Sequence, residues 1–152
     1  MAGSMSNLTA KQQELLVRLH WNFVETDDDP RWGYERAVYA YLAPRKDEIL
    51  YIGKCDGTTV RARWRYGSKH GFWDYINKER LLKNHRLIVA EVELPRGKRL
   101  SRELLSDIES LLIYKTRACG NVQCATSRIS RPGTEVRCLG AWPLGKRIFR
   151  DL

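Results

Sequence analysis

The sequence predicts an α+β domain built on a small, mainly antiparallel three-stranded sheet flanked by helices. Two short runs rich in β-branched and aromatic residues, 37–42 and 49–53, are separated by turn-forming residues, which is typical of a hairpin. A third run, 87–94, alternates apolar and polar residues as a half-buried strand does. An apolar stripe at helical spacing follows in residues 101–117. A chain of 152 residues with this pattern fits one domain around a single core.

The N-terminal segment is expected to form an amphipathic helix over residues 9–24. Thr9 and Gln12 have the spacing of a capping box. The apolar positions that recur at helical spacing are Leu16, Leu19 and Phe23. Residues 26–33 break this pattern and are expected to form a loop. The first four residues resemble a remnant of an expression tag, with Met5 as the natural start.

Two tyrosines are expected to lie close together on the hairpin. Side chains alternate between the faces of a strand, so Tyr39 and Tyr41 share one face of the first strand. Tyr51 shares that face only if the numbers of opposed residues sum to an even value, as when Tyr39 pairs with Tyr51. The alternative is a set of aromatic residues that only stabilise the sheet.

A short helix is expected directly after the hairpin, with Thr58 as its N-cap. It carries three arginines at alternate positions: Arg61, Arg63 and Arg65. Arg61 and Arg65 lie in one row along such a helix, and Arg63 lies away from that row. The pattern therefore leaves open which arginine faces the tyrosines. A second helix is expected over residues 72–82.

The helix over 101–117 is expected to carry a partly desolvated carboxylate. Ser101 is a suitable N-cap for this helix. Its apolar stripe contains Leu104, Leu105, Ile108, Leu111 and Leu112. Glu109 sits at the margin of this stripe, where a carboxylate requires a partner or a cation. An ordinary surface glutamate is the alternative.

The charge of the chain predicts a polyanionic partner. There are 27 Lys and Arg against 18 Asp and Glu, which gives a net charge of +9. No apolar run approaches the roughly 20 residues needed to span a bilayer, and no hydrophobic signal-peptide core is present. The four cysteines are too irregularly spaced for a disulfide framework, and no pair has the tight spacing of a zinc ribbon or finger. We therefore expect no membrane partner and a cytoplasmic or nucleoid-associated protein, either a monomer or a homodimer.

Four motifs in this chain resemble, in order, those of the GIY-YIG nuclease superfamily. The first stands here as Ala37-Val38-Tyr39, and the second stands intact as Tyr51-Ile52-Gly53. The run DIESLLIY, which contains Glu109, resembles the family helix with its metal-binding glutamate. Asn121 falls near the position where an asparagine often ends the domain.

The resemblance covers about residues 35–127 and implies a GIY-YIG-like domain there. Residues 1–34 would hold the tag remnant, the amphipathic helix and the loop. Residues 128–152 would form a basic C-terminal extension packed on the same domain. In many relatives a histidine follows the arginine by one helical turn, and here Tyr66, Lys69 or His70 would take its place.

The resemblance also implies a nuclease that hydrolyses phosphodiester bonds with one Mg²⁺ or Mn²⁺ ion, on DNA in preference to RNA. Glu109 would ligate the metal, and Tyr51 or Tyr39 would position or deprotonate the water. Arg63 or Arg61 would neutralise charge on the phosphate.

Three further roles complete this assignment. Lys54 would lower the pKa of a tyrosine or contact phosphate, and Asn121 would support the shape of the site. Contacts to substrate are assigned to Arg65, Lys69, His70 and Arg128. The alternative is a catalytically inactive module of the same fold that binds nucleic acid or acts as an adaptor.

Overall fold

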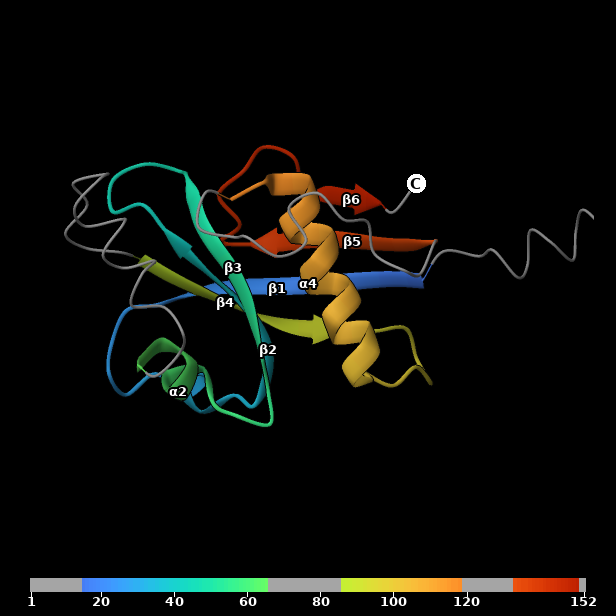
Figure 1. The fold of residues 1–152 in the computed structure, drawn as a ribbon, viewed down its shortest axis with the longest axis horizontal. Coiled ribbons are helices and arrows are strands. Elements are labelled where there is room, and N and C mark those ends of the chain that lie inside the picture. The colour runs from blue at the N-terminus through green and yellow to red at the C-terminus, as the bar shows by residue number, and fades with distance from the viewer. Residues whose placement is uncertain (1–14, 66–85, 119–132, 151–152) are drawn as a thin grey trace, which may run out of the picture.

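A mixed six-stranded sheet forms the main layer of the protein (Figure 1). The computed structural model describes residues 15–65, 86–118 and 133–150. The strands are β1 Leu15–Val24, β2 Arg36–Leu42, β3 Ile49–Asp56, β4 Arg86–Glu93, β5 Thr134–Gly140 and β6 Ile148–Arg150. Their order across the sheet is β3-β2-β4-β1-β5-β6. The β1–β5 pair is parallel and every other neighbouring pair is antiparallel.

The expected three-stranded sheet flanked by helices is therefore wrong. The predicted hairpin is present as β2 and β3, and the predicted third strand is present as β4. These three strands form only half of a curled sheet, which β1, β5 and β6 complete. The described ranges contain two α-helices, α2 Val60–Arg65 and α4 Arg102–Thr116, and one 3-10 turn, η1 Pro30–Gly33. The helix predicted over 72–82 lies outside the described residues.

The helix predicted over residues 9–24 is also wrong within the described part, where residues 15–24 form β1. Buried Val17, Leu19 and Trp21 alternate with outward-facing residues such as Arg18 and His20, which is the period of a strand. The same segment also contains apolar residues at helical spacing, so its pattern fits both structures. Pairing with β4 on one side and β5 on the other decides between them.

The C-terminal segment, expected as a basic extension, contributes the strands β5 and β6 to the sheet. The loop between them folds back on the core through Trp142, whose ring lies 5.2 Å from that of Trp21. The indole of Trp142 also donates to the carbonyl of Lys146 (2.9 Å), which satisfies its buried N–H group.

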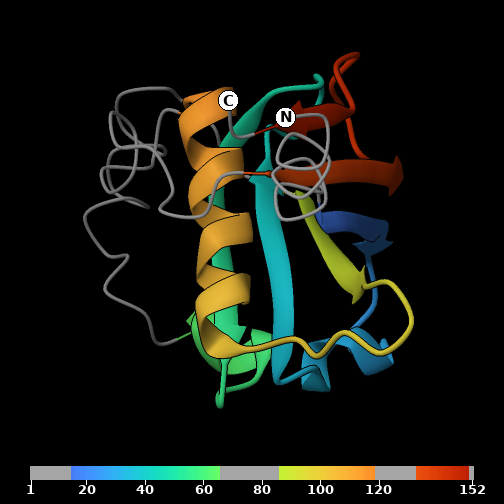
Figure 2. The ribbon, with the colours of Figure 1, turned by 90° about the vertical axis from the view of Figure 1, so that its right-hand side faces the viewer.

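Helix α4 covers one face of the sheet and runs alongside β3 (Figure 2). The predicted N-cap is confirmed, because Oγ of Ser101 accepts from the N–H of Leu104 at 3.1 Å. The predicted apolar stripe of this helix is buried against residues of every strand. No helix among the described residues is long and apolar enough to span a bilayer.

A smaller cluster packs on the opposite face of the sheet, beneath α2 and η1. Its buried members include Tyr39, Tyr41 and Val60. The cap of α2 differs from the expected one, because Oγ1 of Thr59 rather than Thr58 accepts from the N–H of Ala62 (3.1 Å). The edge strand β3 thus lies between α4 on one face and α2 on the other.

Candidate functional site

Three tyrosines from β2 and β3 stack on the α2 side of the sheet. Tyr41 lies directly opposite Tyr51, and Tyr39 lies opposite Gly53, so the opposed residue numbers sum to an even value as expected. The pairing is shifted by two residues from the example of Tyr39 opposite Tyr51. The ring of Tyr41 is 5.4 Å from the rings of both Tyr39 and Tyr51, and the latter two are 6.4 Å apart.

The glycine of the YIG motif leaves room for the side chain of Tyr39. A Cβ atom on Gly53 would lie 2.5 Å from the Tyr39 hydroxyl oxygen and 2.6 Å from its Cζ. The phenol ring of Tyr39 therefore passes directly over the backbone of β3. In this chain Tyr39 lies opposite Gly53, and its ring needs a residue without a side chain at that position.

Arg63, and not Arg61, reaches the tyrosines. The guanidinium of Arg63 donates a hydrogen bond to the hydroxyl of Tyr39, which also accepts one from Tyr41. Arg61 points to the loop before η1, where its Nη2 donates to the carbonyl of Asp27 at 2.6 Å. Its guanidinium lies 4.7 Å from the ring centre of Trp32. The pattern of three arginines left this choice open, and the helix orientation decides it.

Glu109 approaches the same strand from the α4 side. One carboxylate oxygen lies 3.6 Å from Nζ of Lys54, and the backbone N–H of Lys54 donates to this carboxylate. The side chains are mostly buried, with exposures of 19% for Glu109 and 27% for Lys54. The expectation that Glu109 is partly desolvated and needs a partner is confirmed, and that partner is Lys54.

The electrostatics of the site couple Glu109 to the tyrosines across β3. Burial raises the pKa of Glu109 above its ordinary value, while the charge of Lys54 and then that of Arg63 oppose this rise. Burial also raises the pKa of Tyr51, and the negative charge of Glu109 raises it further. Burial is the main cause that raises the pKa of Tyr39, and the interaction with Tyr51 raises it further, while Arg63 opposes this rise.

All three tyrosines are therefore neutral at neutral pH. The expectation that Lys54 lowers the pKa of a tyrosine does not fit this arrangement, because Lys54 pairs with Glu109 and the pKa of Tyr51 is raised. A neutral hydroxyl can donate and accept hydrogen bonds at once, so it can orient a water molecule or a phosphate oxygen. It cannot remove a proton from water as a resident phenolate would.

The donor set at this site fits one divalent cation of the magnesium type. Glu109 is a single carboxylate, and the described residues contain no group of three or more His, Cys, Asp or Glu side chains that could hold a metal ion. Mg²⁺ needs few protein ligands, because it keeps several waters and is completed by substrate phosphates. Tetrahedral zinc sites need three or four protein ligands, and neither Cys55 nor Cys138 belongs to such a group.

The structure brings together five of the predicted catalytic residues and one that the sequence did not single out. The five are Tyr39, Tyr51, Lys54, Arg63 and Glu109. The additional residue is Tyr41, which is fully buried between the other two tyrosines. The sequence does indicate this, because Tyr41 comes two residues after Tyr39 and the side chains of a strand alternate between its faces. The two tyrosines therefore lie on the same face.

Among the other predicted site residues, Arg61 is the one whose side chain the structure describes, and it lies away from this site. Arg61 holds the loop before η1, and Arg65 is the last residue of α2, with a side chain outside the described part. Asn121, Lys69, His70 and Arg128 all lie outside the described residues.

We compared the chain with protein-family models, with curated proteins and with solved structures, and none of these comparisons gave a match. The site therefore has to be interpreted from its own residues. It combines a guanidinium, a lysine, a buried carboxylate and a stack of neutral phenols at one edge strand.

Proposed function

We propose that this protein is a divalent-metal-dependent nuclease that hydrolyses phosphodiester bonds of nucleic acid, with DNA preferred to RNA. The observation that carries the proposal is the convergence of Tyr51, Arg63, Lys54 and Glu109 around β3. These residues come from one strand and from two helices on opposite faces of the sheet. A stable core gains little from placing two cations and a carboxylate there, since buried ion pairs are weak sources of stability.

Hydrolysis of a phosphodiester requires a water nucleophile, stabilisation of the charge on phosphorus-bound oxygens, and a proton for the leaving oxygen. Arg63 is suited to the second task, because its guanidinium presents several donors in a fixed plane that matches phosphate oxygens. Its hydrogen bond to Tyr39 holds this plane in position. Arg63 would then stabilise the charge that develops on the phosphate.

Glu109 is the residue that would hold Mg²⁺ or Mn²⁺. The cation, when bound, would neutralise phosphate charge and lower the pKa of a nearby water. Displacement of the Lys54 ammonium from the carboxylate would free that lysine to contact a phosphate oxygen. This role replaces the expected effect of Lys54 on a tyrosine.

Tyr51 is the tyrosine suited to orient the attacking water. It is only partly buried, whereas Tyr39 and Tyr41 are fully buried. Because its pKa is raised, Tyr51 would act as a neutral hydroxyl that accepts a hydrogen bond from the water. The water oxygen would form a bond to phosphorus as its proton leaves to solvent or to a phosphate oxygen. The bond from phosphorus to the leaving oxygen would break, and the leaving oxygen would take a proton from solvent.

One observation favours a second candidate, a binding module of the same architecture without catalysis. The carboxylate of Glu109 is already paired with Lys54, and the described residues contain no group of three or more His, Cys, Asp or Glu side chains that could hold a metal ion. Such a pair would stabilise a basic surface that only binds phosphates. The two candidates differ in whether nucleic acid is cut when metal is supplied.

The test is a cleavage assay with labelled single- and double-stranded DNA and RNA, in Mg²⁺, Mn²⁺ or EDTA. We expect metal-dependent cutting by the unmodified protein and a loss of at least a hundredfold in Glu109→Gln, which keeps the shape of the side chain. The matched control is Glu103→Gln, an exposed residue in the first turn of the same helix. Equal cutting by both variants would refute the role of Glu109. Tight binding without cutting by the unmodified protein would favour the binding module.

A further inference from the structure

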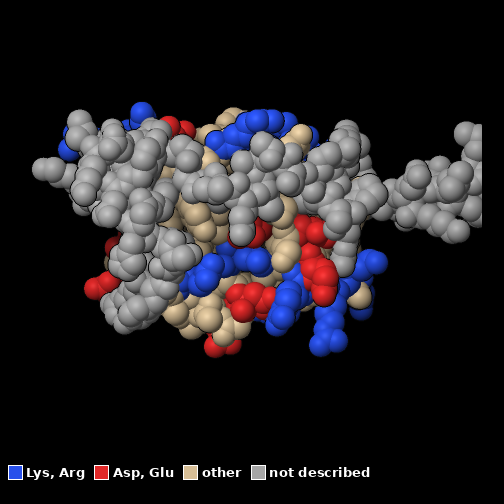
Figure 3. Space-filling model, in the orientation of Figure 1, with Lys and Arg blue, Asp and Glu red and all other residues tan. Residues whose placement is uncertain are grey.

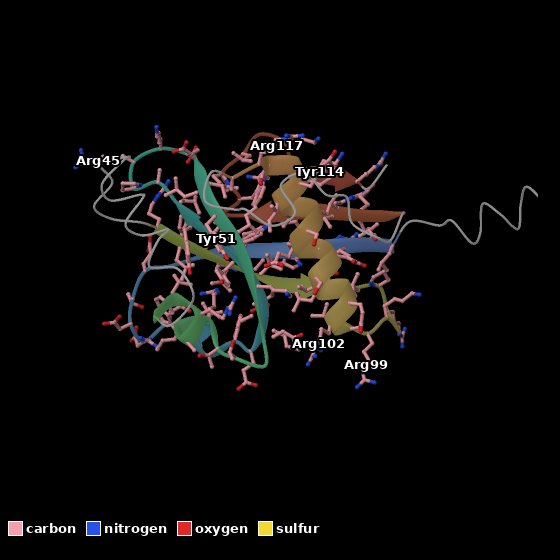
Figure 4. All side chains as sticks on the ribbon, in the orientation of Figure 1. Arg45, Tyr51, Arg99, Arg102, Tyr114 and Arg117 are labelled. Carbon is pink, nitrogen blue, oxygen red and sulfur yellow. The ribbon has the colours of Figure 1, made fainter. Side chains whose placement is uncertain are left out.

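A cluster of exposed cations lies at the N-terminal end of α4, next to the proposed site. We call it the basic strip; its members are Arg36, Arg96, Lys98, Arg99 and Arg102. Figure 4 labels Arg99 and Arg102 at this end of α4, and Figure 3 shows Lys and Arg atoms gathered there. The strip contains no aromatic residue.

Two ion pairs connect the strip to the proposed site as successive links between β3 and α4. The first link joins Lys54 of β3 to Glu109 of α4 (3.6 Å). The second joins Asp56 of β3 to Arg102 of α4, with 3.2 Å between Oδ2 and Nε. Lys54 and Asp56 are two residues apart and share a face of the strand, and Arg102 and Glu109 are seven apart and share a side of the helix. Both links therefore lie along one seam.

Two members of the strip, Arg36 and Arg102, are held in place by specific contacts. Asp56 also pairs with Arg36, whose Nε lies 3.2 Å from Oδ1 of Asp56. Nη1 of Arg36 donates to the carbonyl of Leu100 at 2.7 Å, which ties the loop before α4 to β2. Arg102 nevertheless remains 79% exposed, so its guanidinium is accessible to a ligand. An anchored cation costs less conformational entropy on binding than a freely moving one.

We propose that the basic strip binds the phosphates of a nucleic-acid strand next to the phosphate held at Glu109 and Arg63. This proposal rests on the nuclease function proposed above. Seven helical residues span about 10 Å, which corresponds to roughly three base-pair steps of 3.4 Å along the axis of a duplex. Arg102 and Arg99 then contact the strand a few nucleotides from the cleaved bond.

The chemistry of the strip makes this contact independent of base sequence. Its members are all lysine or arginine, whose charged groups contact phosphates, and none has an aromatic ring that could stack on a base. Binding through such groups releases counterions from the phosphates, so its strength falls steeply with salt. The strip thus positions the strand along the seam and leaves the choice of cleavage site to other features.

The test compares two double variants that remove the same charge. Arg99→Gln/Arg102→Gln removes two cations of the strip. The control, Arg18→Gln/Arg137→Gln, removes two paired cations from β1 and β5, whose side chains are half exposed on the face opposite α4. Affinity for a labelled oligonucleotide duplex is measured in EDTA at several salt concentrations, so that no cleavage is needed. The thermal unfolding of each variant shows whether it is folded.

For the strip variant we expect the slope of log Kobs against log [salt] to become shallower by ~1.8, because each phosphate contact contributes about 0.9. The affinity at 0.1 M salt should fall by up to roughly 60-fold by the same relation. The control should keep the slope of the unmodified protein. Equal slopes for the two variants, or no binding by the unmodified protein, would overturn the proposal. If the unmodified protein does not cut nucleic acid with any metal but the strip variant still shows the shallower slope, the nuclease proposal fails and the strip stands, so the failures of the two proposals can be told apart.

Discussion

The contact between Tyr39 and Gly53 gives a sharp test of how the site is built. In Gly53→Ala the new methyl group would lie 2.5 Å from the hydroxyl oxygen of Tyr39, well inside van der Waals contact. Tyr39 has no free space to retreat into, because it is 1% exposed and packs against Tyr41. The ring must therefore move, or the two strands must separate locally.

The cost of this substitution has two parts. Overpacking a filled core costs about 1–3 kcal/mol. Moving the Tyr39 hydroxyl also breaks its hydrogen bond with the Arg63 guanidinium, and hydrogen bonds to charged groups contribute about 1.5–3 kcal/mol. We expect a total loss of about 2.5–6 kcal/mol in the free energy of unfolding, which lowers the melting temperature by roughly 5–20 °C in a domain of this size.

The assay is urea and thermal unfolding followed by circular dichroism, with Gly145→Ala as the matched control. A Cβ atom at Gly145 meets no atom within 4 Å, so this variant should differ from the unmodified protein by less than about 0.5 kcal/mol. The reasoning is refuted if Gly53→Ala is as stable as Gly145→Ala. It also fails if Gly53→Ala loses stability but its fluorescence shows an unchanged tyrosine stack.

Two further substitutions test the roles assigned to the cations. Lys54→Met leaves the partly buried Glu109 carboxylate without its partner and should cost about 1–3 kcal/mol at neutral pH. The pKa of Glu109 is raised in the folded state, so the folded state binds the extra proton, and the stability of Lys54→Met should fall as pH rises from about 4 through that raised pKa. Urea unfolding across this pH range checks it, and a flat profile would contradict the assignment. Arg61→Ala should cost about 1 kcal/mol through its contacts with Trp32 and Asp27, with no change in cleavage rate. A cleavage defect in a folded Arg61→Ala protein would show that the wrong arginine was chosen.

Several local elements could be predicted because their signals are carried by neighbouring residues. The hairpin of β2 and β3 follows from two strand-like runs joined by a turn, and the N-cap of α4 follows from Ser101. The position of Glu109 at the edge of an apolar stripe indicated desolvation before the structure located Lys54 beside it. The sequence also indicated which pairings of the two strands would place Tyr39 and Tyr51 on the same face, and the observed pairing is one of these.

The errors arose where the pattern allowed two structures. Residues 15–24 place apolar side chains at spacings that suit a helix and also alternate as a strand, and only pairing with β4 and β5 selects the strand. β1 lies far in sequence from β4 and β5, so no pattern of neighbouring residues could predict that it pairs with them. The size of the sheet was missed for the same reason, since β5 and β6 come from a segment expected to be a basic extension.

By itself, the sequence determined the strong charge, the strand and helix signals of the central region, and the residue types available for phosphate chemistry. Only the tertiary structure decided that Arg63 rather than Arg61 meets the tyrosines, that Lys54 pairs with Glu109, and that Arg102 continues the same seam. The physical reason is that these contacts join elements distant in the chain. Their geometry depends on how two helices pack on opposite faces of β3. The hydrophobic periodicity of the sequence predicts each helix and strand, but it does not predict how these elements pack on one another.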